Sequence, residues 1–209
     1  SPYEKAICIT MDGFGDFMSC VRAIGKGSNV KIIDGVYYPH SLGIFYTAFT
    51  QFLGFPKYGD EYKVMGLSAL GEPVFVQEME KIVKRKNNGL FELDTSYFVH
   101  DSGGVEMTWL NEEPYIGRIF SNKFTEVFGE AREKDGELSK KYADIAASMQ
   151  KTYEDVFFHI INDIYRKRVG ELTGDQNDVK LCLSGGCIQN SLANGRIYEK
   201  TPFREVYIP

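Results

Sequence analysis

Two glycines stand side by side in the stretch LSGGCIQNSLANGR, residues 183–196, between an apolar run and a segment of small residues. A glycine pair at a strand-to-helix junction lets the backbone turn tightly and allows a ligand to approach it. Asn190 and Asn194 follow, and their amide groups can donate and accept hydrogen bonds. Gly185 and Gly186 therefore predict either a nucleotide site or close packing of a helix on a strand, and the pattern favours neither. It matches neither the GxxxxGK[ST] phosphate loop nor the GxGxxG dinucleotide fingerprint.

A second candidate is the stretch MDGFGD, residues 11–16, which joins carboxylates to two glycines. Asp12 follows an apolar run, so its carboxylate can hold a cation while neighbouring N–H groups bind phosphate oxygens. Asp-Gly is also a common dipeptide of hairpin turns, and the turn is the interpretation that the residues alone favour.

Glu61 and Lys63 form a third candidate, two residues apart ahead of a glycine-punctuated helical stretch. The pattern fits a buried ion pair or a phosphate-binding lysine. An exposed pair at the start of a helix is the alternative, and it is the one that the sequence favours.

Histidines are the remaining candidates for proton transfer. His40 precedes a predicted helix and can carry a proton or bind a ligand, although such a residue more commonly flanks a helix whose cap is Ser41. His100 and His159 have no patterned acidic or sulfur neighbours and are expected to be structural.

The composition of the chain disfavours some classes of function. The chain has 209 residues, 43% of them hydrophobic and 25% charged, which suits one domain or two small lobes. The net charge of -5 gives no electrostatic footprint for nucleic acid, and no apolar run approaches the ~20 residues of a membrane span. The four cysteines have neither CxxC nor zinc spacing, and Cys8 and Cys182 lie in apolar runs as small hydrophobes. A reducing, cytoplasmic location is expected, with no signal peptide.

Hydrophobic patterning predicts the elements that position these residues, in an α/β fold. Residues 6–11, 17–25 and 29–38 predict three strands in an antiparallel meander. Helices are expected over 40–55, 61–70 and 73–85, with Pro73 at a helix start. Residues 89–94 and 97–103 fit short strands, and residues 124–137 fit a turn-rich approach to the next element.

A long amphipathic helix is predicted over residues 139–169, stopped at Gly170. A loop over 174–178 leads to a strand at 179–184, then to the glycine pair with its helix, and then to a last strand at 205–209. Strand, helix and strand in this order predict a parallel crossover. Because both ends of the sequence are close to core strands, we expect the chain to be a piece of a longer protein.

Several ordered motifs together resemble the O-carbamoyltransferases of antibiotic and nodulation-factor biosynthesis. The resemblance covers nearly the whole chain and rests on five stretches, MDGFGD (11–16), HSLGIFYTAFTQFLGF (40–55), DEYKVMGL (60–67), DIAASMQ (144–150) and LCLSGGCIQNSLANGR (181–196). The last two are also similar to the related protein that makes threonylcarbamoyl-adenosine in tRNA. The resemblance implies an actin-like ATPase domain with a ribonuclease-H-like core.

The resemblance also implies a reaction. Enzymes of this family have a smaller domain that makes carbamoyl-adenylate from carbamoyl phosphate and ATP. The actin-like domain then transfers the carbamoyl group to a hydroxyl of a sugar or antibiotic-like acceptor, near a divalent metal, expected to be iron. Residues 1–209 correspond to the central part of that domain. The segments with the other metal ligands and the second domain would lie outside the chain, so the chain alone is expected to be inactive.

Carried over by motif, Asp12 is the one metal ligand within the chain, and Gly185, Gly186 and Asn190 line the nucleotide. Two alternatives to carbamoyl transfer remain open. One is a nucleotide-binding, actin-like sensor without transfer chemistry. The other is tRNA threonylcarbamoylation, which the net acidity and the HSLG and EYKVMGL stretches disfavour.

Glu61 and Lys63 are implied to lie near the reacting groups, as catalytic residues. The chain departs from the family at Cys187, Ile188 and Gln189, where the family usually has Val-Ala-Leu. This departure falls between the glycine pair and its asparagine, so it bears on the shape of the adenine pocket.

Overall fold

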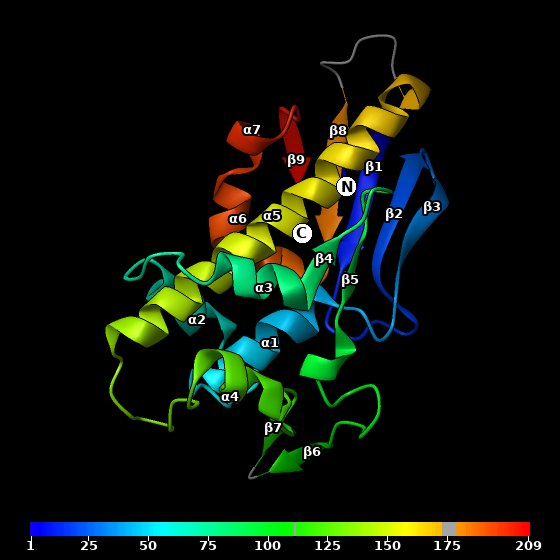
Figure 1. Ribbon diagram of the computed structural model, residues 1–209. Coiled ribbons are helices and arrows are strands. Elements are labelled where there is room, and N and C mark those ends of the chain that lie inside the picture. The colour runs from blue at the N-terminus through cyan, green and yellow to red at the C-terminus, as the bar shows by residue number, and fades with distance from the viewer. Residues whose placement is uncertain (111, 173–178) are drawn as a thin grey trace. The chain divides into compact units, whose positions relative to one another are not determined.

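The structure is a computed structural model that describes residues 1–110, 112–172 and 179–209 (Figure 1). The chain divides into two compact units, each built from separate segments of the sequence. The first unit contains residues 1–43, 85–92 and 154–209, and the second contains residues 44–84 and 93–153. The loop predicted over 174–178 lies outside the described residues.

A five-stranded sheet forms the first unit. Its strands are β1 (Lys5–Met11), β2 (Met18–Lys26), β3 (Asn29–Tyr37), β8 (Lys180–Ser184) and β9 (Glu205–Tyr207). They lie in the order β3-β2-β1-β8-β9. The first three strands pair antiparallel, whereas β1–β8 and β8–β9 pair parallel. Both the predicted meander and the predicted parallel crossover are therefore confirmed.

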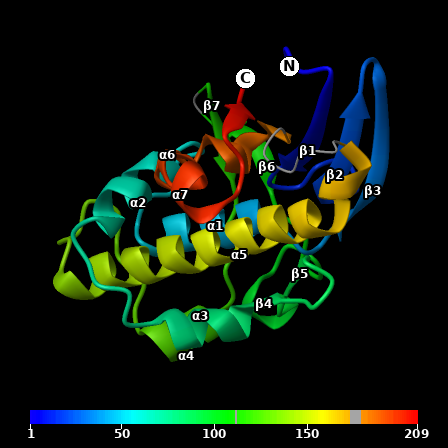
Figure 2. The same cartoon turned by 90° about the horizontal axis from the view of Figure 1, so that it is seen from above.

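Side-chain alternation along β1 decides which face of this sheet is covered. Ile7 and Ile9 are almost fully buried, whereas Cys8 and Thr10 point to the other face and are more accessible. The second half of the long helix α5 (Lys140–Leu172) lies along the covered face (Figure 2). Ile160, with no exposed surface, is part of the apolar stripe that α5 buries there. The buried side chains of β1 and the apolar stripe of α5 thus form one core.

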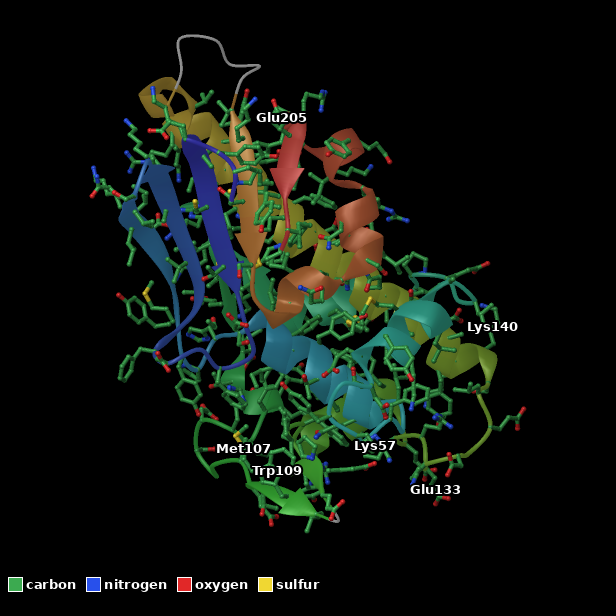
Figure 3. All side chains as sticks on the ribbon, turned by 180° about the vertical axis from the view of Figure 1, so that it is seen from behind. Lys57, Met107, Trp109, Glu133, Lys140 and Glu205 are labelled. Atoms are coloured by element: carbon green, nitrogen blue, oxygen red, sulfur yellow. The ribbon has the colours of Figure 1, made fainter. Side chains whose placement is uncertain are left out.

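Helices and an aromatic cluster form the second unit. Its elements are most of α1 (Leu42–Phe52), then α2 (Glu61–Ser68), α3 (Val76–Ile82), η1 (Thr95–Tyr97), the hairpin β6 (Met107–Leu110) and β7 (Glu113–Ile116), α4 (Asn122–Phe128) and the first half of α5. Phe49 packs on Phe124 and Phe128 with ring centroids 4.7 and 5.4 Å apart, so aromatic packing forms its core. Met107 and Trp109 project from the hairpin and are exposed (Figure 3).

A further two-stranded sheet, β4 (Val83–Arg85) with β5 (Phe91–Leu93), has residues in both units and corrects one helix prediction. Helix α3 begins at Val76 rather than Pro73 and ends at Ile82 rather than residue 85. The predicted strand at 89–94 is confirmed as β5.

Three other predictions were wrong in detail. Residues 97–103 form no strand, since η1 ends at Tyr97 and one isolated bridge joins Phe98 to Phe120. Helix α4 occupies part of the segment expected to be turns. Helix α5 does not stop at Gly170 but continues to Leu172, because a glycine inside a helix costs only about 1 kcal/mol.

Candidate functional site

The carboxyl ends of β1 and β8 bring Asp12 next to the glycine pair. The two strands are parallel neighbours, and the register that pairs Thr10 with Ser184 carries both chains forward to the same edge of the sheet. There the Gly186 N–H donates a hydrogen bond of 2.7 Å to Asp12 Oδ1. A bond between an amide and a carboxylate is charge-assisted, so it holds the turn firmly. The structure therefore joins the first two candidate stretches in one place.

The two glycines of the pair have different requirements. Gly185 has φ +105°, and a Cβ on it would lie 2.2 Å from the Met11 carbonyl oxygen. The fold itself therefore requires glycine there. Gly186 lies outside the left-handed region, and the nearest atom to a Cβ on it is Asp12 Oδ1 at 3.7 Å. The fold does not need that position to be bare, so the space beside Gly186 is open to a ligand.

Residues 12–17 connect β1 to β2, so the hairpin interpretation of MDGFGD is confirmed. The Asp12 N–H donates to the Ser19 carbonyl at 2.8 Å, and the Asp12 carbonyl accepts from Ser41 Oγ at 3.1 Å. A Cβ on Gly13 would meet nothing within 4 Å. The hairpin loop thus fixes the Asp12 backbone and leaves open space at the next residue.

Asn190 and Asn194 stabilise η3 (Gly186–Gln189) and α6 (Ser191–Gly195), the short helical segments that follow the glycine pair and precede α7 (Ile197–Lys200). Asn190 is only 4% exposed, and its Oδ1 accepts the Ala193 N–H at 3.0 Å as the N-cap of α6. Asn194 Nδ2 donates to the Ile188 carbonyl at 2.6 Å. Sequence reasoning assigned these amides to a ligand and missed the cap. A nucleotide contact from Asn190 stays a prediction.

Glu61 and Lys63 belong to the second unit. Each of them contacts a different neighbouring residue. Glu61 Oε1 accepts from Thr47 Oγ1 at 2.9 Å, and Lys63 Nζ lies 2.6 Å from Asp60 Oδ1. The hydrogen bond that Lys63 donates to Asp60 raises the pKa of Lys63, whose side chain is 37% exposed at the start of α2. The ion pair at this helix start is therefore Asp60–Lys63, and the catalytic roles of Glu61 and Lys63 stay predictions.

The histidines behave as expected where the structure tests them. A ring nitrogen of His159 lies 2.9 Å from the Lys86 carbonyl oxygen, and His100 is buried with its ring 5.6 Å from that of Phe98. Both have structural surroundings. The proton-carrying role considered for His40 stays a prediction.

The described residues do not form a complete metal site. Across residues 1–110, 112–172 and 179–209, no three His, Cys, Asp or Glu side chains gather closely enough to hold an ion. Transition metals in proteins generally have three or more protein ligands. Asp12 alone does not meet that need. No helix in the described ranges has the length and apolarity of a membrane span.

Comparison with known proteins gives the family. The family model described as Carbamoyltransferase N-terminus matches residues 1–209. The uncharacterized protein sll1178 of Synechocystis sp. is 33% identical over the whole chain, which covers 31% of that protein. Nodulation protein NolNO of Sinorhizobium fredii is 29% identical, and nodulation protein NolO of Bradyrhizobium diazoefficiens is 27% identical. The whole chain matches 26% and 32% of their lengths, respectively. The chain thus spans about a quarter to a third of these relatives, and it belongs to the carbamoyltransferase N-terminus family.

Proposed function

We propose that the protein containing this chain transfers a carbamoyl group from an ATP-derived carbamoyl-adenylate to a hydroxyl of a sugar or antibiotic-like acceptor. The observation that carries this proposal is the family match over all 209 residues. Two relatives that match the whole chain are named nodulation proteins, so a hydroxyl-bearing small molecule made for nodulation is the first acceptor class to test.

We further propose that the first unit is the core of an actin-like ATPase domain of ribonuclease-H-like topology. The strand order β3-β2-β1-β8-β9 supports this, with three antiparallel strands followed by two parallel ones. Ligands of open α/β sheets commonly bind beyond the carboxyl ends of the strands. Asp12 and the glycine pair lie at that edge in the present chain.

The residues of the chain have distinct tasks in this proposal. Gly13 and Gly186 leave room for phosphate groups to approach the backbone on either side of Asp12. Asp12 fixes the glycine turn through its bond to the Gly186 N–H and contributes negative charge. When bound, ATP supplies the activation of the carbamoyl group. The roles of Glu61 and Lys63 near the reacting groups rest on the family resemblance.

The test is calorimetric titration of the full-length protein with ATP, comparing Gly186→Val with the matched control Gly170→Val. A Cβ at either position meets no close neighbour, so both variants are expected to fold. We expect Gly186→Val to lower ATP affinity at least tenfold and Gly170→Val to leave it unchanged. Equal affinity in both variants would reduce the glycine pair to a packing feature.

Carbamoyl transfer is tested separately, with carbamoyl phosphate, ATP and hydroxyl-bearing acceptors. Formation of an O-carbamoyl product by the full-length protein is expected, with loss of product in Gly186→Val. Tight ATP binding without any carbamoylated product would contradict the transferase and favour a nucleotide sensor.

A further inference from the structure

Two cysteines face each other across neighbouring strands of the first unit. Cys8 on β1 and Cys182 on β8 are register partners in the parallel pair. Neighbouring strands lie about 4.8 Å apart, and a disulfide spans Cα separations of about 4.4–6.8 Å. Both cysteines are free and half-buried, and the Cys8 thiol donates a long hydrogen bond of 3.9 Å to the Ala6 carbonyl. The fold therefore brings two thiols to a distance that a disulfide can bridge.

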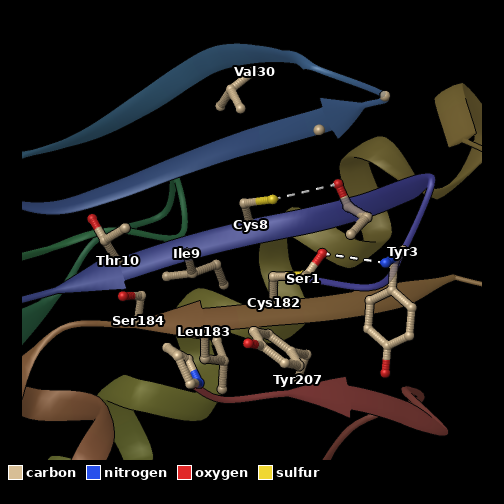
Figure 4. A pocket seen from close by; sticks show the side chains of 14 residues that line it. Ser1, Tyr3, Cys8, Ile9, Thr10, Val30, Cys182, Leu183, Ser184 and Tyr207 are labelled. Atoms are coloured by element: carbon tan, nitrogen blue, oxygen red, sulfur yellow. Dashed lines mark hydrogen bonds between the residues drawn. The ribbon is translucent and has the colours of Figure 1, made fainter.

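The pair is accessible from the sheet face that α5 does not cover. Cys8 and Cys182 line a depression of about 460 Å³ on this face, together with Thr10, Ser184 and Tyr207 and with Ser1 and Pro209, the two ends of the 209 residues (Figure 4). A small solute such as a peroxide can enter a depression of this size. Accessibility and proximity together distinguish these two thiols from buried cysteines of the core.

The two thiols are expected to differ in acidity because each lies beside the other. The neighbouring Cys8 thiol, with smaller contributions from Ser1 and its amino group, lowers the pKa of Cys182, against the effect of burial. The neighbouring Cys182 thiol, with burial, raises the pKa of Cys8. In contrast, Cys20 is 1% exposed, and burial raises its pKa to about 12. Cys182 is therefore the expected nucleophile of the pair, because the thiolate is the reactive form.

Soft-metal binding is the other chemistry open to a pair of thiols. The described residues place no third His, Cys, Asp or Glu beside the pair to complete a metal cluster. Oxidation needs only the two sulfurs. We propose that Cys8 and Cys182 form a dithiol modification site that a hydroperoxide oxidises to an intramolecular disulfide.

The reaction balances with hydrogen peroxide as the oxidant. The Cys182 thiolate attacks one peroxide oxygen, the O–O bond breaks, and hydroxide leaves and takes up a proton to become water. The resulting Cys182 sulfenic acid is attacked by the Cys8 sulfur, which forms the S–S bond and releases the second oxygen as water. Two thiols are oxidised and one peroxide is reduced, giving one disulfide and two waters.

The test uses the full-length protein with Cys20→Ala and Cys187→Ser, and with any cysteines outside residues 1–209 replaced by serine. The folded protein is treated with hydrogen peroxide, denatured in an alkylating agent and weighed by mass spectrometry. We expect a monomer that has lost two hydrogen atoms, contains no alkylatable thiol and is restored by a reductant. The matched control adds Cys8→Ser and is expected to stop at a sulfenic acid that dimedone traps.

Peptide mapping of the wild-type protein keeps the test valid if these replacements disturb folding. Cleavage before Asp12 separates Cys8 from Cys20, and cleavage after Leu183 separates Cys182 from Cys187. A cross-linked Cys8–Cys182 peptide from the folded protein supports the proposal, provided that unfolding before oxidation yields mixed pairings. Sulfinic acids without a cross-link, or disulfides only between molecules, would overturn it. Because the readout is thiol chemistry, it is independent of the proposed carbamoyl transfer.

Discussion

Asp12 and Gly186 are joined by a hydrogen bond of 2.7 Å although 174 residues separate them in the sequence. This bond allows the two possible tasks of Asp12, holding the turn and binding a metal, to be separated. Asp12→Asn retains an oxygen that can accept the Gly186 N–H, whereas Asp12→Ala removes it. We expect Asp12→Ala to lower the free energy of unfolding by about 1–3 kcal/mol and Asp12→Asn by less.

In the full-length protein, both replacements are expected to abolish bound metal and carbamoyl transfer, because neither supplies a carboxylate ligand. Elemental analysis and product formation are the measurements. The 209-residue chain alone is expected to bind less than one metal per molecule. Normal turnover by Asp12→Asn would limit Asp12 to its structural task.

Gly185→Ala is expected to destabilise the first unit by about 1–3 kcal/mol, because its φ of +105° disfavours a side chain. The added Cβ would also lie 2.2 Å from the Met11 carbonyl oxygen. Gly186→Ala is the matched control and is expected to stay within about 0.5 kcal/mol. Urea denaturation of both variants checks the difference, and equal losses would contradict it.

Arg22 is the buried cation of the first unit, with 1% of its side chain exposed. Its guanidinium contacts Asp34 Oδ1 at 2.7 Å and Asp163 Oδ2 at 2.8 Å. Arg22→Met would leave the Asp163 carboxylate, 7% exposed, without its buried partner, so we expect a loss of about 3–5 kcal/mol.

The control for Arg22 is the exposed ion pair between Lys57 and Glu113, whose side chains are 52% and 60% exposed. Figure 3 shows Lys57 at the surface. Lys57→Met is expected to change the free energy of unfolding by less than about 1 kcal/mol. Chemical denaturation monitors both variants. An Arg22→Met loss as small as that of Lys57→Met would mean that the network contributes little.

The lowered pKa of Asp163 should make the free energy of unfolding depend on pH in the acidic range. Burial raises this pKa, but the hydrogen bonds from Lys167 and Arg22 outweigh burial, and the folded-state pKa is lowered. The stabilisation is therefore present above the unfolded-state pKa of about 3.9 and is lost as the pH falls through the folded-state value. Asp163→Asn is expected to flatten the pH dependence of the unfolding free energy below about pH 4. An unchanged slope in denaturation series at several pH values would argue against this assignment.

Local patterning predicted the elements whose faces are set by short-range periodicity. The meander of β1 to β3 and the helix α5 are examples, because alternation and helical spacing continue over many residues in each. The pattern over 97–103 also alternates, with Phe98 and His100 buried. No strand forms, because Asp94 caps the turn at Thr95–Tyr97 and only Phe98 has a bridge partner.

Contacts between segments that are far apart in the sequence determine the parts of the fold that local patterning did not predict. Val83 continues the helical pattern of α3, but pairing of β4 with β5 overrides that local preference. The sequence alone predicted Cys8 and Cys182 as separate small hydrophobic residues, because the register between two strands cannot be read from either segment. One signal was available: Cys8 precedes Asp12, and Cys182 precedes Gly186, by the same four residues.

The pairing of β1 with β8 also sets an order of events during synthesis on the ribosome. Strand β1 is made early, and its partner β8 emerges only after about 170 further residues, a delay of roughly 10–35 s at typical rates. Until then β1 can pair with β2 along one edge only, and its other edge has unsatisfied N–H and C=O groups. Among contacts within these 209 residues, the contact of Asp12 with Gly186 is thus one of the last that translation permits.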